Sequence, residues 1–91
     1  MTSVSRTLPI VNAKGLHARA SARFVETVEA HEAEARVTRD GQTVNGDSIM
    51  GLLMLAASKG TSIDVTCSGD EAELLLAALD DLLADGFGEP D

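Results

Sequence analysis

Aromatic residues are scarce in this sequence, which has no tryptophan, no tyrosine and two phenylalanines among 91 residues. The apolar fraction is nevertheless 44%, an ordinary value for a globular protein, and it is supplied by Ala, Leu, Val, Ile and Met. We therefore predict an aliphatic core. Because a chain of this length can bury one hydrophobic core but not two, residues 1–91 are expected to form a single domain.

Cysteine and long apolar runs are also lacking. The single thiol, Cys67, has no partner for an internal disulfide, and neither a secretory signal nor an apolar stretch of membrane-spanning length is recognisable. These absences favour a cytoplasmic protein. Cys67 falls at an alternating position in an apolar strand pattern, so we expect it to be a small buried hydrophobe and not a reactive thiol.

Basic residues are few: seven against fifteen acidic residues, for a formal net charge of −8. The imbalance is uneven, because residues 1–39 carry six bases and four acids, whereas residues 40–91 carry one base and eleven acids. Nucleic acids and anionic membranes bind basic surfaces, so neither is an expected partner. The region around Arg19 and Arg23 would suit an acidic patch on another protein.

Hydropathy periodicity predicts strands and helices in the order β-α-β-β-α-β-α. Alternation around Leu8 predicts the first strand, and Pro9 indicates a sheet edge because proline cannot donate to a ladder. Apolar residues four apart predict a helix over 17–30. Alternation over 33–38, followed by Asp40-Gly41, predicts a short antiparallel hairpin.

The segment NGDSIMGLLMLAAS predicts a second helix that continues to Ser58, with Asp47 or Ser48 as its N-cap. Its residues are apolar on nearly every side, so part of the helix is expected to enter the core and part to remain exposed as a docking patch. The candidates for exposed, partner-binding residues are Met50, Leu53 and Met54.

Alternation over 63–67 predicts the last strand, and Asp70 with Glu73 resembles a capping box before a third helix that ends ahead of Gly86. Short strands with one apolar face, mixed with three helices, are typical of a two-layer α+β domain. We predict that helices cover one face of an antiparallel sheet and that solvent covers the other.

His17 lies immediately before the first predicted helix, in GLHARASARF. A neutral imidazole is a nucleophile, and the positive end of a helix together with Arg19 and Arg23 disfavours its protonation. If the ring receives a phosphoryl group, the N–H groups of Ala18 and Arg19 and an arginine side chain can bind the new oxygens. Gly15 permits the tight backbone approach that this arrangement requires.

Other interpretations of the histidines remain open at this point. A histidine near a helix start is more often a surface or capping residue, and GxHxR alone favours that interpretation. A metal site is less favoured, because His31 lies at the far end of the helix and no paired ligand spacing appears; His31 fits a favourable charge near a helix C-terminus. A Ser-His-Asp hydrolase needs a nucleophile elbow and a pocket that this short chain scarcely provides.

From about Thr7 to Phe87, the sequence resembles the HPr family, the histidine-containing phosphocarriers of the bacterial phosphoenolpyruvate-dependent phosphotransferase system. The resemblance is carried by GLHAR around His17 and SIMGL beginning at Ser48, in combination and at this spacing. It implies an open-faced β-sandwich with three helices on a four-stranded antiparallel sheet. It also implies a monomeric phosphoryl carrier and not a stand-alone enzyme, with no cofactor and no metal.

The resemblance further implies roles for single residues. His17 would accept a phosphoryl group from enzyme I on Nδ1 and pass it to a IIA domain, in sugar uptake or in nitrogen and carbon regulation. Arg19 would contact that group and the acidic residues of partners, and Arg23 would join the docking surface. Ala20 replaces the usual motif proline, a change that keeps the helix and restores one N–H donor. These motif forms resemble the nitrogen-related branch most.

Ser48 matches the serine that an HPr kinase/phosphorylase modifies in lineages that have one. Its simplest role is an N-cap, typically worth about 1 kcal/mol. A phosphate there would add roughly −1.5 to −2 charge at a positive helix end, which the fold tolerates but an acidic partner does not. The alternative function is therefore a regulatory interaction protein that signals through Ser48; a ligand-binding module without phosphorylation is a weaker third hypothesis.

Overall fold

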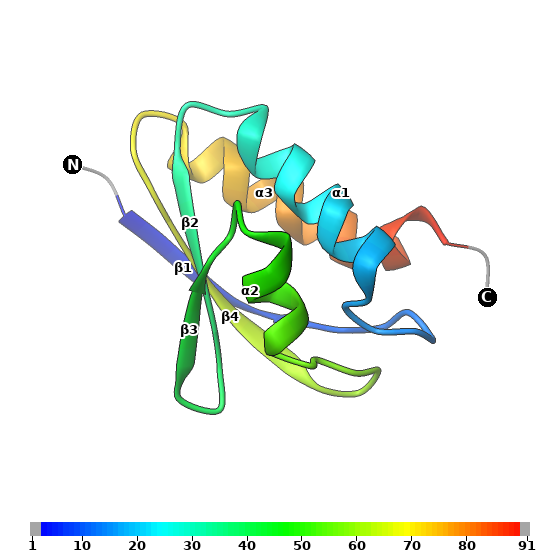
Figure 1. The fold of residues 1–91 in the computed structure, drawn as a ribbon. Coiled ribbons are helices and arrows are strands. Elements are labelled where there is room, and N and C mark those ends of the chain that lie inside the picture. Colours follow the sequence, from blue (N-terminus) through cyan, green and yellow to red (C-terminus); the bar gives the residue numbers. More distant parts are fainter. Residues whose placement is uncertain (1–2, 90–91) are drawn as a thin grey trace.

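The computed structural model describes residues 3–89 and confirms the predicted order of strands and helices (Figure 1). A short 3₁₀ turn, η1, follows the last helix. In chain order the elements are β1 (Ser3–Pro9), α1 (Ala18–Glu29), β2 (Glu34–Arg39), β3 (Gln42–Asn45), α2 (Ile49–Met54), β4 (Ser62–Ser68), α3 (Ala72–Ala84) and η1 (Gly86–Gly88).

The four strands form one antiparallel sheet in the order β1-β4-β2-β3. β1 lies at an edge, as Pro9 predicted. β2 and β3 form the predicted hairpin, in which Arg39 pairs with Gln42 across the turn. Asp40 and Gly41 have φ values of 51° and 78°, and two successive positive φ values are the requirement of the tight hairpin turn that Asp-Gly favours.

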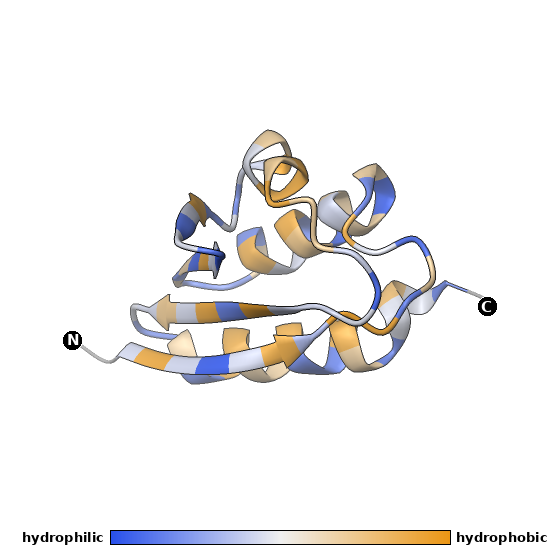
Figure 2. Ribbon diagram, turned by 90° about the horizontal axis from the view of Figure 1, so that it is seen from below, coloured by the Kyte–Doolittle hydropathy of each residue, from blue (hydrophilic) through white to orange (hydrophobic). Residues whose placement is uncertain are grey.

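The sheet has one apolar and one polar face, as predicted. Strand residues alternate between hydrophobic and hydrophilic along the chain (Figure 2), and the helices lie over the apolar face (Figure 1). On the opposite face, polar side chains pair across the strands: Ser5 with Thr66 at 2.8 Å and Thr7 with Asp64 at 2.6 Å. Cross-strand polar pairs of this kind stabilise a face that water covers.

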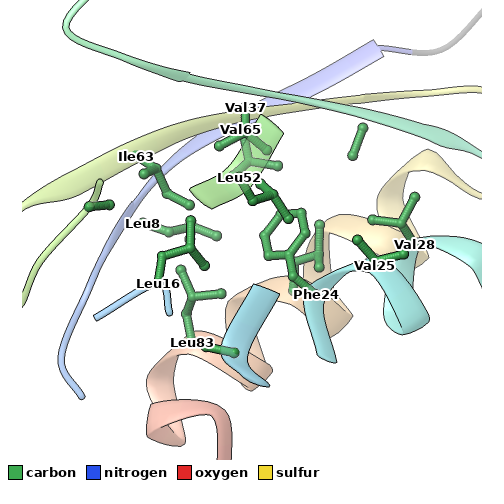
Figure 3. Close-up of a cluster of buried hydrophobic side chains, with 14 of the residues drawn as sticks. Leu8, Leu16, Phe24, Val25, Val28, Val37, Leu52, Ile63, Val65 and Leu83 are labelled. Carbon is green, nitrogen blue, oxygen red and sulfur yellow. The ribbon is translucent and has the colours of Figure 1, made fainter. Parts of the chain in front are cut away.

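The core is aliphatic except for the rings of Phe24 and Phe87, which are both fully buried. Figure 3 shows side chains from the sheet, α1, α2 and α3 directed into one interior. Cys67 lies in this core without exposed surface, and burial raises the pKa of its thiol to about 11. The prediction of a buried cysteine is confirmed, and its low reactivity stays a prediction.

The second helix is shorter than predicted, because α2 ends at Met54 and does not reach Ser58. Ala56 takes a left-handed φ of 50°, and the backbone carbonyl of Ala57 accepts a hydrogen bond from the N–H of Leu16 at 2.8 Å. The apolar run therefore leaves the helix to pair with the segment before His17, a distant contact that local periodicity does not encode.

The predicted capping box at Asp70 is wrong. α3 begins at Ala72, and Glu71 occupies the N-cap position without a side-chain cap. The carboxylate of Glu71 instead accepts the backbone N–H of Glu32 at 2.7 Å, and the N–H of Glu71 donates to the Glu32 carbonyl at 3.0 Å. These contacts tie the residue before α3 to the loop after α1. Within residues 3–89, no helix combines the length and apolarity needed to cross a bilayer.

Candidate functional site

His17 is the N-cap residue of α1. Its backbone is extended, with φ −79° and ψ −175°, and its carbonyl accepts the N–H of Ser21 at 2.8 Å. The ring nitrogen Nδ1 accepts the N–H of Arg19 at 3.3 Å, so it satisfies one of the donors that a helix start leaves free. The structure thus places the imidazole at the positive end of α1, where the sequence predicted it.

The loop before His17 requires glycine at position 15. Gly15 has a φ of +65°, and a Cβ atom built there would lie 2.5 Å from the carbonyl oxygen of Ala57 and 2.8 Å from Cα of Ser58. The tight approach expected at Gly15 is therefore present, but its partner is the segment after α2 and not the amides of α1. This packing ties the His17 loop to the end of α2.

Two residues that the sequence analysis missed, Asn12 and Glu89, contact the same site. One carboxylate oxygen of Glu89, Oε2, pairs with Nε2 of His17. The other, Oε1, accepts a hydrogen bond from Nδ2 of Asn12 at 3.0 Å, and the same Nδ2 donates to the Gly15 carbonyl at 2.8 Å. Asn12 is 1% exposed, so this network is built into the interior side of the site.

The Asn12 hydrogen bond lowers the pKa of the Glu89 carboxyl, and contacts with His17 and the charge of Lys14 act in the same direction against the opposing effect of burial. Glu89 is therefore ionised at neutral pH. A carboxylate accepts hydrogen bonds and cannot donate them, so Nε2 of His17 carries the proton in this contact. Nδ1 then holds its lone pair toward the N–H of Arg19.

An unusual backbone turn brings Glu89 to the histidine. Gly86, Phe87 and Gly88 have consecutive φ values of 61°, 59° and 73°, which reverse the chain after α3. Phe87 adopts this left-handed conformation although it has a Cβ, and its ring is completely buried. The end of the described chain consequently lies beside the start of α1 (Figure 1). The Gly-Phe-Gly pattern was the one sequence signal that could have indicated this turn.

The other predicted site residues lie around this centre. Ala18 is the exposed first residue of α1, and Arg19 contributes its backbone N–H while its side chain is exposed. Arg23 is exposed one turn further along; its Nη1 lies 3.5 Å from the position that a Cβ of Gly88 would occupy. Ala20, at the usual proline position, is fully buried, and α1 runs through it without interruption.

The start of α2 carries the second predicted site. Ser48 is its N-cap, and the hydroxyl oxygen accepts the N–H of Gly51 at 3.0 Å. Met50 and Met54 are 69% and 64% exposed, as expected, whereas Leu53 is half-buried. Ile49 is also exposed. We call Ile49, Met50 and Met54 the α2 apolar patch.

His31 lies apart from this site, at the C-terminal end of α1. Its Nδ1 donates a hydrogen bond to the carbonyl of Thr27 at 2.7 Å, which satisfies one of the free carbonyls at a helix end. In the part of the chain that the structure describes, no three His, Cys, Asp or Glu side chains gather into a metal-binding cluster.

Together, these features define a class: a small, open-faced α+β sandwich that presents an imidazole at a helix N-terminus. A family model described as "PTS HPr component phosphorylation site" matches residues 4–85. The phosphocarrier protein HPr of Neisseria meningitidis serogroup A is 48% identical over 87 residues, which cover 94% of this chain and 97% of that protein.

Solved structures agree. HPr-C-His from Thermoanaerobacter tengcongensis superposes with a TM-score of 0.89 at 38% identity, covering 100% of both chains. A phosphocarrier protein HPr from Bacillus anthracis str. Ames has a TM-score of 0.86 at 35% identity, covering 91% of this chain and 99% of that one. The chain belongs to the HPr family, the phosphocarriers of the phosphotransferase system.

Proposed function

We propose that this chain carries a phosphoryl group on Nδ1 of His17, taken from enzyme I and passed to a IIA domain. The observation that carries the proposal is the orientation of the ring, whose Nδ1 points its lone pair at the first amides of α1. A phosphoryl group on that atom would place its oxygens where the N–H groups of Ala18 and Arg19 can donate to them. The carrier would act as a monomer in the bacterial cytoplasm, in sugar uptake or in nitrogen and carbon regulation.

Two neighbouring surfaces support docking of both partners at one place. The exposed guanidinium groups of Arg19 and Arg23 lie on α1 and suit acidic side chains. The α2 apolar patch, with Leu53 at its edge, offers hydrophobic contact, and the contact between Leu16 and Ala57 holds the end of α2 against the His17 loop. One docking surface would then bring each partner's reacting group to His17.

The direct test is phosphorylation in vitro. Incubation with phosphoenolpyruvate and an enzyme I should give a phosphoramidate on His17 that is labile in acid and stable in base, identified by mass spectrometry of peptides. His17→Ala should abolish it. His31→Ala is the matched control, because it removes the other histidine without touching the site and should leave phosphorylation unchanged. Incorporation that survives His17→Ala would contradict the proposal.

A second candidate function is regulation through Ser48. The observation in its favour is that the hydroxyl lies at the edge of the α2 apolar patch and is half-buried as a cap. A phosphate there would put negative charge beside the surface to which acidic partners would bind. Incubation with a cognate HPr kinase tests whether Ser48 is modified. In cells, retained function in His17→Ala together with loss of function in Ser48→Ala would favour regulation over phosphoryl transfer.

A further inference from the structure

We propose that Glu89 is a positioning residue for His17: it holds the ring proton on Nε2 and compensates the positive charge that the ring gains when Nδ1 takes a phosphoryl group. The inference rests on the proposed function of His17 and adds to it a carboxylate partner contributed by the far end of the chain.

The contact between Glu89 and His17 is largely shielded from water and is supported by Asn12. The side chain of Glu89 is 11% exposed and that of His17 is 27% exposed, so little water competes for the pair. Asn12 holds the second carboxylate oxygen at 3.0 Å and is itself fixed to the Gly15 carbonyl at 2.8 Å. With both oxygens engaged, the carboxylate has one orientation toward the ring.

The backbone turn before Glu89 also helps to fix the position of this residue. A non-glycine residue in the left-handed region is strained, and Phe87 adopts that conformation at φ 59°. Burial of its ring offsets the cost and anchors the turn. Flexible glycines on either side, Gly86 and Gly88, let the chain reverse so that Glu89 reaches the start of α1.

Other charged groups lie around the loop before α1, the start of α1 and the turn before Glu89. Lys14 acts on Glu89 from the loop before α1, and Arg23 lies over Gly88 from α1, with Asp85 Oδ2 3.8 Å from the position of a Gly88 Cβ. Arg19 follows on the exposed side of α1. Glu89, and none of these other groups, is recorded in contact with the His17 ring.

The transfer of a phosphoryl group to Nδ1 would give the Glu89 carboxylate a role in stabilising charge. The lone pair of Nδ1 forms the new N–P bond, while the bond from phosphorus to the phosphorylated donor breaks and the donor's leaving atom keeps that electron pair. Nε2 keeps its proton throughout, so the ring becomes a cation. A carboxylate on Nε2 stabilises that cation, in the way that an acid orients and stabilises the histidine of a catalytic triad. The reverse step returns the electron pair to Nδ1.

The test compares Glu89→Gln with the wild-type chain. Glutamine keeps the length of the side chain, and its amide oxygen can still accept a hydrogen bond from Nε2–H, but it removes the charge. We expect phosphorylation by phosphoenolpyruvate and enzyme I to slow roughly tenfold. The acid limb of the pH–rate profile should move to lower pH, because the ring without its carboxylate is less readily protonated. Asp81→Asn, an exposed acid on α3, is the matched control for one lost charge and should change neither quantity.

A second measurement does not depend on phosphorylation. In ring ¹⁵N spectra of the unphosphorylated protein, the wild type should show a protonated Nε2 and a bare Nδ1, and Glu89→Ala should raise the fraction with the proton on Nδ1. Unchanged spectra in Glu89→Ala would overturn the inference, as would a wild-type rate and pH profile in Glu89→Gln. Failure of the wild type to accept a phosphoryl group would instead contradict the proposed function, and the spectra would still decide the role of Glu89.

Discussion

His17 uses the same atom for two purposes. Nδ1 caps α1 by accepting the N–H of Arg19, and it is also the proposed nucleophile. Phosphorylation on Nδ1 would consume the lone pair that makes this cap, but the phosphoryl oxygens would lie close to the same N–H groups and could accept from them in turn. The start of α1 would therefore stay capped in both forms of the carrier, by the ring in one and by the phosphoryl group in the other.

Gly15 gives a prediction at the same scale. Gly15→Ala should lower the free energy of unfolding by about 2–4 kcal/mol, because it combines a positive φ with a backbone clash against Ala57. Gly41→Ala is the matched control: its φ is also positive, at +78°, but a Cβ there meets nothing within 4 Å, so a loss of about 1 kcal/mol is expected. Urea unfolding measures both, and equal losses would show that the close approach to Ala57 carries no cost.

Cys67 gives a second prediction. Its thiol has no exposed surface and burial raises its pKa to about 11, so the nucleophilic thiolate is nearly absent at pH 8. We expect iodoacetamide to leave the native protein unmodified at pH 8 and to alkylate it fully in 6 M guanidinium chloride, as read by intact-protein mass spectrometry. Rapid modification of the native chain would mean that β4 opens readily.

At the scale of elements, α2 is a helix of six residues, too short to be stable by itself, so it depends on packing and on its cap. Leu52 anchors it in the core without exposed surface, which leaves the α2 apolar patch facing outward. The same shortness explains the patch: a helix that buries one main anchor must expose its other apolar residues, and here those residues lie where partners are proposed to bind.

The Ser48 cap can be tested through stability. Ser48→Ala should lower the free energy of unfolding by about 1 kcal/mol, because the N–H of Gly51 loses its acceptor. Ser48→Asp should retain most of the stability, since aspartate is an equally good N-cap. Ser62→Ala, at an exposed position of β4, serves as the control and should change stability by less than about 0.5 kcal/mol. If the alanine variants at both positions unfold alike, the hydroxyl of Ser48 is not a functioning cap.

At the scale of the whole molecule, the chain is strongly acidic, with a net charge of −8. Glu89 differs from an exposed acid because Asn12 and His17 both contact its carboxylate. The pKa of Glu89 is lowered in the folded protein, first by Asn12, while in the unfolded chain it takes the usual value of about 4.3. A lowered carboxyl pKa contributes stability that is complete above the unfolded value and disappears as the pH falls through the folded value.

The corresponding experiment measures urea unfolding of the wild type and of Glu89→Gln between pH 2.5 and 7. The wild type should be more stable than the variant at pH 5, and this difference should shrink steadily as the pH falls below about pH 4. The comparison cancels the general relief of acidic repulsion, which affects both proteins equally. A difference that does not vary with pH would show that Glu89 has no special interaction in the folded state.

Much of the fold could be predicted from the sequence because its signals are local. The hairpin at Asp40-Gly41, the alternation in β4 and the end of α3 before Gly86 each depend on residues within a few positions of one another. The same holds for His17 as the N-cap of α1. Where the prediction failed, a distant contact decided: the end of α2 follows from the pairing of Leu16 with Ala57, and the start of α3 from that of Glu71 with Glu32.

The sequence by itself determined the aliphatic two-layer domain, the position of the imidazole at a helix start and the resemblance to phosphocarriers, since periodicity, caps and short motifs encode all three. Only the tertiary structure decided which group lies behind that imidazole. Glu89 and His17 are separated by 72 positions, and no local pattern joins them. They meet because α3 packs across the sheet, Phe87 is buried and the turn around it reverses the chain onto the start of α1.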